Sequence, residues 1–391
     1  MGGTYRLAIV TTHPIQYHSD WYRALAAHPA LDVRVYYCHQ ASPEEQAKAG
    51  FGVEFDWDVP LLSGYPYTFL KNVAKTPGQG RFAGFDTPEI RDIIRSGPYD
   101  AVLVNGWHYK SAWQAIWACW KSRVKVMARG DSHLHTPRSA PTRLAKAVGY
   151  PRFIRRFDAC LAVGKWSREY FLHYGARGDR IFFVPHAIDN EAFKREAERL
   201  LPSRWELRQR WGLGEDAVVF AFVGKFVGEK RPMDFVQAIS RAVLQNSKIQ
   251  GLMIGDGPLR AECESIVRSQ QIPIRFTGFL NQSQIVTGYV ASDAVALLSE
   301  ETWGMVVNEA MACSRPCIVS DKVGCGPDLI VSGKTGAIFP LGAIDALATT
   351  IVDMARAQTR LSEMGAEANR KIQEYSVPVA VKGTVECLAP F

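Results

Sequence analysis

Two carboxylates, Glu301 and Glu309, lie eight positions apart in the stretch EETWGMVVNEAMA at residues 300–312. In one continuous helix, eight steps would leave their side chains about 80° apart, so a single helix does not align them well. The apolar run before them is typical of a short buried strand, and Gly304 interrupts the pattern that follows. We therefore expect a strand, a loop that contains Glu301, and a helix that contains Glu309. The free N–H groups at the start of that helix suit an anion.

A second group of polar residues follows another strand-like run, in FVGKFVGEKRP at residues 222–232. Gly224 and Lys225 come at the end of that strand, and Lys230 and Arg231 come where the next helix should begin. Two cations beside a glycine turn and a helix N-terminus suit a diphosphate group. The alternative is that these lysines are solvated side chains after a strand.

Two further glycine turns also follow strand-like runs. MIGDGPLR contains Gly255, Asp256 and Gly257, and VGCGPDLI occupies residues 323–330. The backbone N–H groups of such turns can face phosphates or a sugar. One GxG is weak evidence, but glycine turns, lysines and glutamates at successive strand ends of one domain together indicate a phosphate-binding site.

The elements that carry these motifs are strand-like runs that alternate with helix-length segments. This alternation predicts an α/β fold, in which parallel sheets are covered by helices on both faces. It restarts after a polar, helical stretch that follows residue 190, so we expect two doubly wound, Rossmann-like domains, 1–190 and 191–375, with a tail, 376–391, that packs back toward the first. Ligands of such folds bind at the carboxyl ends of strands, which places the expected site in a cleft between two facing domains. The expected strands are 5–12, 31–38, 100–106, 124–130, 158–164, 217–226, 249–257, 274–279, 293–299, 316–321 and 336–340.

The composition is that of a soluble globular protein, since 47% of the 391 residues are hydrophobic and the mean hydropathy is -0.10. No apolar run approaches the roughly 18 residues of a membrane span. The N-terminus leads directly into a strand-like run, so we expect no secretory signal. Cys313, Cys317 and Cys325 are close in sequence, but no histidine lies nearby. We therefore expect reduced, structural thiols in the cytoplasm in preference to a zinc site.

Six motifs, in the correct order, resemble those of the retaining, nucleotide-sugar-dependent glycosyltransferases of family 4, which have the GT-B fold. ETWGMVVNEAMACSRPCIV resembles the hallmark ExFGxxxxEAMAxGxPVV, with Trp303 for Phe and Ser314 for Gly. GKFVGEK resembles GRLxxxK with Lys225 in the place of Arg, and VPHAIDNEAF resembles VPNGVDxxxF with His186 for Asn. FTGFL and GCGPDLI are similar to FxGxx and GGxxEll, with Asp328 for Glu. The N-terminal THPIQYHSDWYRAL resembles a subgroup of bacterial surface-polysaccharide transferases.

The resemblance implies a role for each of these positions. Glu309 binds the ribose hydroxyls of the nucleotide, Glu301 lies beside the hydroxyls of the donor sugar, and backbone amides at 303–306 meet sugar or phosphate. Lys225 and Lys230 neutralise the diphosphate as it departs, an electrostatic role that needs no metal. The expected donor-binding residues are Gly224, Lys225, Lys230, Gly255, Asp256, Gly257, Glu301, Trp303, Gly304, Met305, Val306 and Glu309.

In the N-terminal half, the resemblance implies that a histidine after a strand holds the donor sugar. VKVMARGDSHLH offers His133 for this role, with Arg129 and Asp131 beside it. His13 and Gln16 follow the first strand, where a loop of the family approaches the donor phosphate and the acceptor. The alternatives are a structural histidine at 133 and turn or N-cap roles at 13 and 16. The expected catalytic residues are His133, Glu301 and Lys230.

The expected mechanism uses no metal and no cofactor. A double displacement needs a carboxylate nucleophile close to the anomeric carbon, and no N-terminal motif plainly supplies one. The resemblance implies a front-face substitution, in which an oxygen of the leaving phosphate helps to deprotonate the acceptor. Asp56 and Asp58 form a DxD like the metal motif of the other large glycosyltransferase fold. They precede a proline and lie far from every phosphate-type loop, so we expect loop packing or acceptor contact instead.

The predicted function is transfer of a sugar from a nucleotide diphosphate, with a UDP-sugar favoured and a GDP-sugar possible, to a glycan or lipid-linked acceptor in polysaccharide biosynthesis. A sugar-nucleotide epimerase shares the architecture, but its carboxylate–histidine set is not found in this sequence. A polyanion-binding protein would explain the net charge of +7, but it gives the motifs no role. We therefore expect no nucleic-acid partner.

Charge is unevenly distributed along the chain. Residues 1–190 carry 24 Lys and Arg against 16 Asp and Glu, whereas the remainder carries 22 against 23. Residues 132–157 contain six basic and no acidic residues, interleaved with apolar ones such as Leu144 and Val148. Such a basic amphipathic surface suits an anionic membrane, so we expect peripheral association with the inner face of the cytoplasmic membrane. A solvated helix over an ordinary core is the alternative.

Overall fold

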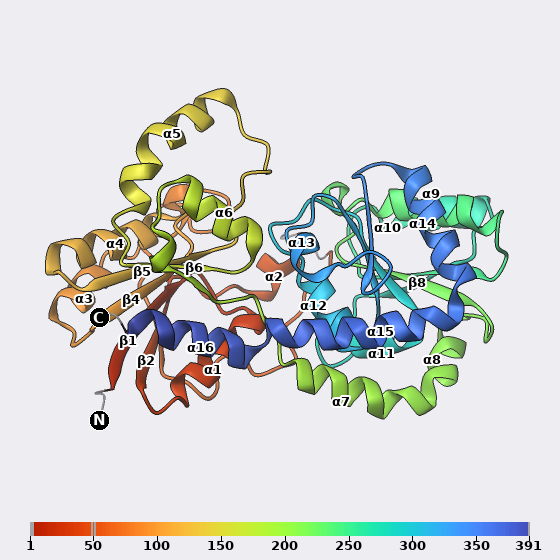
Figure 1. Ribbon diagram of the computed structural model, residues 1–391, viewed down its shortest axis with the longest axis horizontal. Coiled ribbons are helices and arrows are strands. Elements are labelled where there is room, and N and C mark those ends of the chain that lie inside the picture. The colour runs from red at the N-terminus through yellow and green to blue at the C-terminus, as the bar shows by residue number, and fades with distance from the viewer. Residues whose placement is uncertain (1–3, 48–49, 51, 390–391) are drawn as a thin grey trace. The chain divides into compact units, whose positions relative to one another are not determined.

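The computed structural model describes residues 4–47, 50 and 52–389 of the chain (Figure 1). Contacts divide the chain into two compact units, each built around one parallel sheet. The first unit consists of three segments of the chain: one that ends at Ala41, one from Pro60 to Ile188, and one that begins at Ser376. The second unit comprises Ser42–Val59 and Asp189–Tyr375. The described residues of segment 42–59, which lies within the predicted first domain, therefore pack with the second unit.

The sheet of the first unit has seven strands in the order β3-β2-β1-β4-β5-β6-β7, and all neighbours are parallel. The central strands β1 and β4 are neighbours although two strands separate them in sequence, so the winding of the chain reverses direction between them. The strands are β1 (Tyr5–Thr11), β2 (Leu31–Tyr37), β3 (Tyr67–Phe69), β4 (Ala101–Asn105), β5 (Lys125–Gly130), β6 (Ala159–Ala162) and β7 (Ile181–Phe183).

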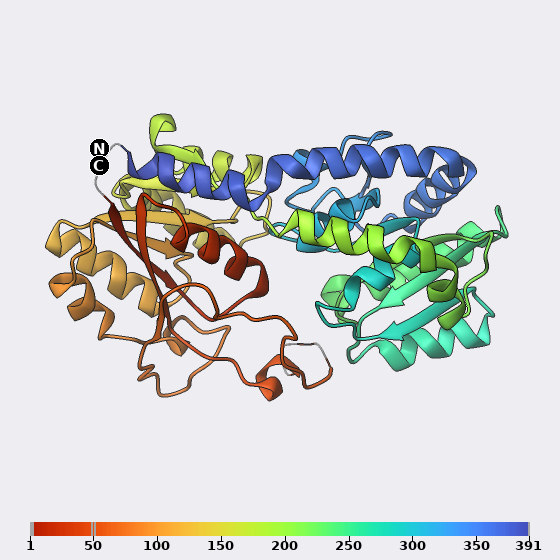
Figure 2. The same cartoon turned by 90° about the horizontal axis from the view of Figure 1, so that it is seen from below.

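Both faces of this sheet are buried, because helices cover each of them. Successive β1 residues point to opposite faces. Leu7 and Ile9 belong to the core that α1 (Gln16–Ala26) and α16 (Val377–Leu388) cover, and these two helices pack beside each other (Figures 1 and 2). Ala8 and Val10 belong to the core on the other face. The helices there are α3 (Ile90–Ser96), α4 (Lys110–Ser122), α5 (Ala140–Ile154) and α6 (Lys165–His173).

Helix α5 differs from the other helices of this unit because it projects from the sheet (Figure 1). Phe153 and Ile154 at its C-terminal end are buried, whereas nearly all side chains of residues 140–149 are exposed. No helix among the described residues combines the length and the apolar character that a bilayer span requires.

The sheet of the second unit has six parallel strands in the order β10-β9-β8-β11-β12-β13. The winding reverses between β8 and β11. The strands are β8 (Val218–Val223), β9 (Ile249–Ile254), β10 (Ile274–Gly278), β11 (Ala294–Leu297), β12 (Cys317–Ser320) and β13 (Gly336–Phe339). The helices are α2 (Pro43–Gln46), α7 (Asn190–Leu200), α8 (Arg204–Arg210), α9 (Pro232–Val243), α10 (Arg260–Ser269), α11 (Ile285–Ala291), α12 (Met305–Ala312), α13 (Gly326–Leu329), α14 (Ile344–Arg356) and α15 (Gln358–Ile372).

Helix α9 illustrates how the sequence forms these elements. Proline at the first helical position needs no hydrogen-bond acceptor for its nitrogen, and Pro232 occupies that position. Phe235, Ile239 and Ala242 recur at helical spacing, and all three are buried in the core on one face of the sheet.

The predicted α/β fold with two parallel-sheet, Rossmann-like domains is confirmed, and every expected strand is present. The sequence did not indicate β3 and β7, which are the three-residue edge strands of the first sheet and are too short to show a pattern. The cleft between facing domains stays a prediction.

Candidate active site

Two predicted cations, Lys225 and Lys230, and the Glu301 carboxylate meet at the carboxyl ends of β8 and β11, where the winding of the second sheet reverses. Lys225 follows β8, and Glu301 follows β11. Open α/β sheets bind ligands at such a reversal point. The Lys230 ammonium forms an ion pair with the Glu301 carboxylate, which also accepts a hydrogen bond from the Ser299 hydroxyl.

The loop that carries Glu301 is fixed by backbone bonds to the loop after β12. The Glu301 N–H donates to the Lys322 carbonyl at 3.2 Å, and the Gly324 N–H donates to the Glu301 carbonyl at 3.0 Å. Glu301 and Val323 thus form an isolated parallel bridge. The carboxylate is therefore presented by a short extended segment that the rest of the sheet edge holds in place.

Lys225 adds a second ammonium group to this cluster. Its pKa is lowered, first by burial and then by the nearby Lys230, while Glu301 acts in the opposite direction. Lys225, Lys230 and Glu301 together carry one excess positive charge. This excess suits a bound anion, which would relieve the repulsion between the two ammonium groups.

Helix α12 begins beside this cluster, as the sequence predicts. Gly304 is its N-cap and has φ of +110°, a conformation that glycine adopts easily. A Cβ at this position would lie 2.8 Å from Cδ2 of Leu297, so the turn also lacks space for a side chain. The amides of Met305 and Val306 belong to the first turn of the helix, whose N–H groups have no partners within the helix.

The Trp303 side chain serves packing, since only 4% of the residue is exposed. Its indole N–H donates to the side-chain oxygen Oδ1 of Asn308 at 2.8 Å, and its ring lies 5.8 Å from that of Tyr375. The Tyr375 hydroxyl in turn donates to Asp328 at 2.8 Å. Any contact that Trp303 makes to a donor must therefore come from its backbone.

Glu309 lies on α12, partly buried, with two side-chain partners that the sequence did not indicate. The Tyr289 hydroxyl donates to its carboxylate at 2.6 Å, and the Gln282 amide donates at 3.4 Å. Burial raises the pKa of Glu309, while these two hydrogen bonds act in the opposite direction. Tyr289 and Gln282 lie on α11 and the loop before it, and nothing in their own sequence surroundings marks them as partners of Glu309.

The turn of Gly255, Asp256 and Gly257 is closely packed against the end of β8. A Cβ on Gly255 would lie 1.9 Å from the Gly224 carbonyl oxygen, and one on Gly257 would lie 2.8 Å from the Phe226 nitrogen. Asp256 accepts hydrogen bonds from the Gly257 amide and from Arg260. Backbone packing therefore explains the glycines here, and a role in donor binding stays a prediction.

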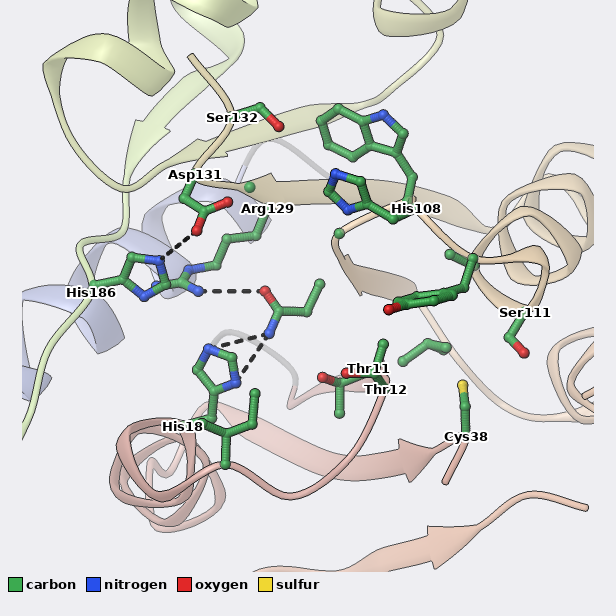
Figure 3. Close-up of a pocket in the computed structure, with 18 of the residues that line it drawn as sticks. Thr11, Thr12, His18, Cys38, His108, Ser111, Arg129, Asp131, Ser132 and His186 are labelled. Carbon is green, nitrogen blue, oxygen red and sulfur yellow. Dashed lines mark hydrogen bonds and ion pairs between the residues drawn. The ribbon is translucent and has the colours of Figure 1, made fainter. Parts of the chain in front are cut away.

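The first unit contains a pocket of about 200 Å³ at the carboxyl ends of β1, β4 and β5, its own reversal point (Figure 3). Arg129 lines this pocket and is 2% exposed. Its guanidinium donates to the Val184 and Pro185 carbonyls at 3.3 and 3.0 Å and to the Asn105 side chain at 3.4 Å. Burial lowers the pKa of Arg129 to about 10.

Two histidines that the sequence did not assign to this pocket line it beside Arg129. His186 lies 3.7 Å from the Asp131 carboxylate, and the Asn105 side chain contacts the His18 ring at 3.3 Å. Figure 3 shows both histidines at the pocket. Burial, followed by the charge of Arg129, lowers the pKa of both imidazoles, and that of His18 lies well below the usual 6.5. Both rings are therefore neutral at pH 7. His186 belongs to a motif identified in the sequence, but only the fold brings it to β5.

The predicted N-terminal residues are placed unequally around this pocket. Arg129 and Asp131 line it, and Thr12, Ile15 and Tyr17 line it in place of His13 and Gln16. The ring of His13 contacts the Thr12 hydroxyl at 3.0 Å, and Gln16 is the first residue of α1. His133 is 1% exposed and packs against the rings of His135 and Trp166. The structure therefore does not bring His133 into the lining of the pocket.

Asp56 and Asp58 have partners in the second unit. The Asp58 carboxylate accepts a hydrogen bond from the Ser283 amide at 3.1 Å, and the Asp56 carbonyl accepts one from the Asn281 side chain at 2.8 Å. Within the described part of the chain, no group of three or more His, Cys, Asp or Glu side chains is arranged to hold a metal ion. Its eight cysteines are all buried free thiols.

Comparisons with known proteins identify relatives of this chain and structures that share its fold. Among curated proteins, the N-acetyl-alpha-D-glucosaminyl L-malate synthase of Bacillus anthracis is 30% identical over 171 residues, 43% of this chain and 44% of that protein. The D-inositol 3-phosphate glycosyltransferase of Rhodococcus jostii strain RHA1 is 25% identical over 361 residues, 84% of this chain and 77% of that protein. Among solved structures, Anabaena Alr3699/HepE in complex with UDP has a TM-score of 0.74 at 16% identity, covering 99% of this chain and 100% of that one.

Two family descriptions account for most of the chain. The one called "Glycosyl transferase 4-like domain" matches residues 14–187, and the one called "Glycosyl transferases group 1" matches residues 203–371. Neither describes an epimerase or a polyanion-binding protein, the two other classes that the sequence left open. The chain therefore belongs to the glycosyltransferases of family 4 type with the GT-B fold.

Proposed function

We propose that the protein transfers a sugar from a nucleoside diphosphate to a glycan or lipid-linked acceptor in polysaccharide biosynthesis. The observation that carries this proposal is the cluster of Lys225, Lys230 and Glu301 at the reversal point of the second sheet, beside the N-terminus of α12. The cluster offers two cations to a diphosphate and one carboxylate to sugar hydroxyls. Glu309, which Tyr289 and Gln282 hold, is the proposed partner of the ribose hydroxyls.

UDP is the favoured nucleotide, with GDP as the second choice. Alr3699/HepE has been crystallised with UDP and with UDP-glucose, and it shares the fold over nearly the whole chain. Glu309 and the two lysines would contact only ribose and phosphate, which all nucleoside diphosphates share. The choice of base therefore rests on the structural neighbour.

The proposed reaction is a substitution at the anomeric carbon with retention of configuration. The bond from that carbon to the β-phosphate oxygen breaks, a bond to the acceptor hydroxyl oxygen forms, and the acceptor proton passes to an oxygen of the leaving phosphate. Lys225 and Lys230 stabilise the negative charge that develops on this leaving group. Because these two ammonium groups supply the positive charge, we propose that the reaction needs no divalent metal.

The pocket of the first unit is the proposed acceptor site. Its lining combines donors and acceptors of hydrogen bonds, among them Asn105, Arg129 and Asp131, with neutral imidazoles. Such a lining suits hydroxyl groups, which both donate and accept hydrogen bonds.

We further propose a cytoplasmic, peripheral position at an anionic membrane, with α5 as the contact. Leu144 and Val148 on this helix are 68% and 60% exposed, and its residues include no acid. Arg156, in contrast, stacks over the Trp120 ring at 3.6 Å and so has a partner within the protein. Binding to phosphatidylglycerol vesicles should therefore fall with salt and with Leu144→Ser plus Val148→Ser. Unchanged binding by this double variant would contradict the α5 contact.

The test of the proposed function is release of nucleoside diphosphate from a panel of UDP-, GDP- and ADP-sugars. The wild-type enzyme should turn over one of them, slowly with water and faster with the correct acceptor. Lys230→Ala should abolish most of this release while retaining a cooperative thermal unfolding transition. Equal turnover by wild type and Lys230→Ala would contradict the proposed donor site.

A further inference from the structure

Residues 52–59, which we call the strap, form an extended segment outside both sheets. Their sequence GVEFDWDV alternates apolar and acidic side chains. Val53, Phe55 and Trp57 are half-buried, whereas Glu54, Asp56 and Asp58 are exposed. This alternation is typical of an extended chain with one face packed against the protein. By its contacts the strap belongs to the second unit, although it lies between two strands of the first in sequence.

Two anchors attach the strap along the edge of the proposed donor site. At one end, the Asp58 carboxylate accepts hydrogen bonds from the amide and the hydroxyl of Ser283, in the loop after β10. At the other end, the backbone at Gly52 approaches so closely that a Cβ there would lie 2.9 Å from Cα of Gly257. The strap therefore extends from the glycine turn after β9 to the loop after β10.

This loop also contacts the carboxylate that we assign to the ribose. The Asn281 side chain donates to the Asp56 carbonyl at 2.8 Å, and the Gln282 side chain donates to Glu309 at 3.4 Å. Residues adjacent in sequence thus contact the strap and the ribose carboxylate. Because the base of a nucleotide is bonded directly to the ribose, a base beside Glu309 lies close to this loop.

The strap brings aromatic rings to this place. The Phe55 ring lies 4.4 Å from the ring of Phe279, the first residue after β10, at an interplanar angle of 38°. The Trp57 ring meets Phe55 edge-on at 5.0 Å. Phe279 belongs to the second unit in sequence as well as in space, whereas Phe55 reaches it only through the strap. The result is an aromatic cluster at the proposed base end of the donor site.

We propose that Phe55, together with Phe279, forms the surface on which the nucleobase of the donor stacks, and that Asp58 positions the strap for this role. The inference rests on the proposed function of the second unit as donor site. Every base has a π face, so stacking adds affinity without selecting one base. The strap therefore strengthens nucleotide binding in general, and it leaves the choice between uracil and guanine to other groups.

The test measures binding of UDP, GDP and inorganic pyrophosphate to the full chain by calorimetry. Phe55→Ala should lower the affinities for UDP and GDP by similar factors, each about tenfold or more, because a base–aromatic stack is lost. Pyrophosphate has no base, so its affinity should stay within about twofold. Asp58→Asn should also weaken UDP binding. Glu54 is an exposed acid on the same strap, and Glu54→Gln should leave UDP binding unchanged. Thermal unfolding of each variant verifies that it is folded.

Several results would overturn the inference. If Phe55→Ala binds UDP with unchanged affinity, Phe55 does not stack on the base. If Phe55→Ala binds UDP more tightly, the strap competes with the nucleotide. Equal losses for UDP and pyrophosphate make Phe55 a general support of the fold. If the wild-type protein binds none of the three ligands, the second unit does not contain the proposed donor site. That last result contradicts the proposed function, and with it the strap, whereas the first three contradict the strap alone.

Discussion

Replacing Glu309 by Gln should move nucleotide affinity and protein stability in opposite directions. The substitution keeps the shape of the side chain but removes the charge that we expect the ribose hydroxyls to contact. Hydrogen bonds to charged groups contribute about 1.5–3 kcal/mol, so the affinity for UDP should fall by about 10- to 150-fold. Calorimetric titration of UDP into wild type and Glu309→Gln measures this loss.

Stability should increase because the folded protein disfavours the charged form of Glu309. Burial raises its pKa above the value in the unfolded chain, so the folded state binds the proton more tightly. Stability therefore falls as pH rises from the usual carboxyl range through the raised pKa, and the cost persists at neutral pH. Glu309→Gln carries no charge and avoids this cost. Its melting temperature should exceed that of wild type at pH 7, and the difference should shrink toward pH 4.

Tyr289→Phe is the matched control for this reasoning. It removes the 2.6 Å hydrogen bond that favours the ionised carboxylate, so it should raise the pKa of Glu309 further and destabilise the protein at pH 7. A Glu309→Gln protein that binds UDP as wild type does would refute the ribose assignment. A lower melting temperature for Glu309→Gln at pH 7 would refute the account of its burial.

Four further predictions concern the two units. Lys230→Ala should lower the affinity for UDP far more than the affinity for uridine, because only UDP carries the diphosphate. Equal losses of affinity for both ligands in a titration would contradict a phosphate-binding role of Lys230. EDTA should leave transferase activity unchanged, and loss of activity that Mg²⁺ or Mn²⁺ restores would contradict the metal-free mechanism. Asn308→Ala leaves the buried Trp303 N–H without its 2.8 Å acceptor, so urea unfolding should show a free energy lower by about 1–3 kcal/mol, and an unchanged value would contradict this. Because burial lowers the pKa of His18, the unfolded chain takes up a proton on this residue at a higher pH than the folded protein does, so the free energy of unfolding should decrease as pH falls below about 6.5. This decrease should be less steep in His18→Gln. Identical pH dependences of the two proteins from pH 5 to 7 would contradict this expectation.

The sequence placed the expected donor residues on the correct elements because these residues lie close to their own strands. Lys225 lies two residues after the end of β8, Glu301 lies in the loop after β11, and Glu309 lies on the helix that follows, so the alternating pattern placed them near one sheet edge. Parallel strands guarantee that consecutive carboxyl ends share an edge. The ion pair of Lys230 with Glu301 is consistent with this placement, although the two residues are 71 positions apart in the sequence.

The partners that adjust these residues could not be predicted in the same way. Tyr289 reaches Glu309 from α11, and His186 reaches Arg129 from the segment after β7. Such contacts depend on the register and tilt of elements that are distant in sequence. The role of His133 in holding the donor sugar stays a prediction: the residue follows β5, as the sequence indicates, but Asp131 and Ser132 line the pocket and His133 does not.

The strap shows a third limit. Its alternating pattern indicates an extended chain with one buried face, but pattern alone does not tell which sheet the apolar face covers. The sequence placed residues 42–59 in the first domain because the alternation of strands and helices restarts only after residue 190. Their attachment to the second unit instead depends on specific partners, Asn281 and Ser283, that only the fold reveals.

We propose that the second unit binds a nucleoside diphosphate at the carboxyl ends of β8 and β11. A crystal structure of the full chain with UDP tests it most directly. We expect the diphosphate to lie within hydrogen-bond distance of Lys225 and Lys230, and the ribose hydroxyls to contact the Glu309 carboxylate. UDP bound in the pocket beside Arg129 in the first unit, with Lys230 still paired only to Glu301, would contradict it.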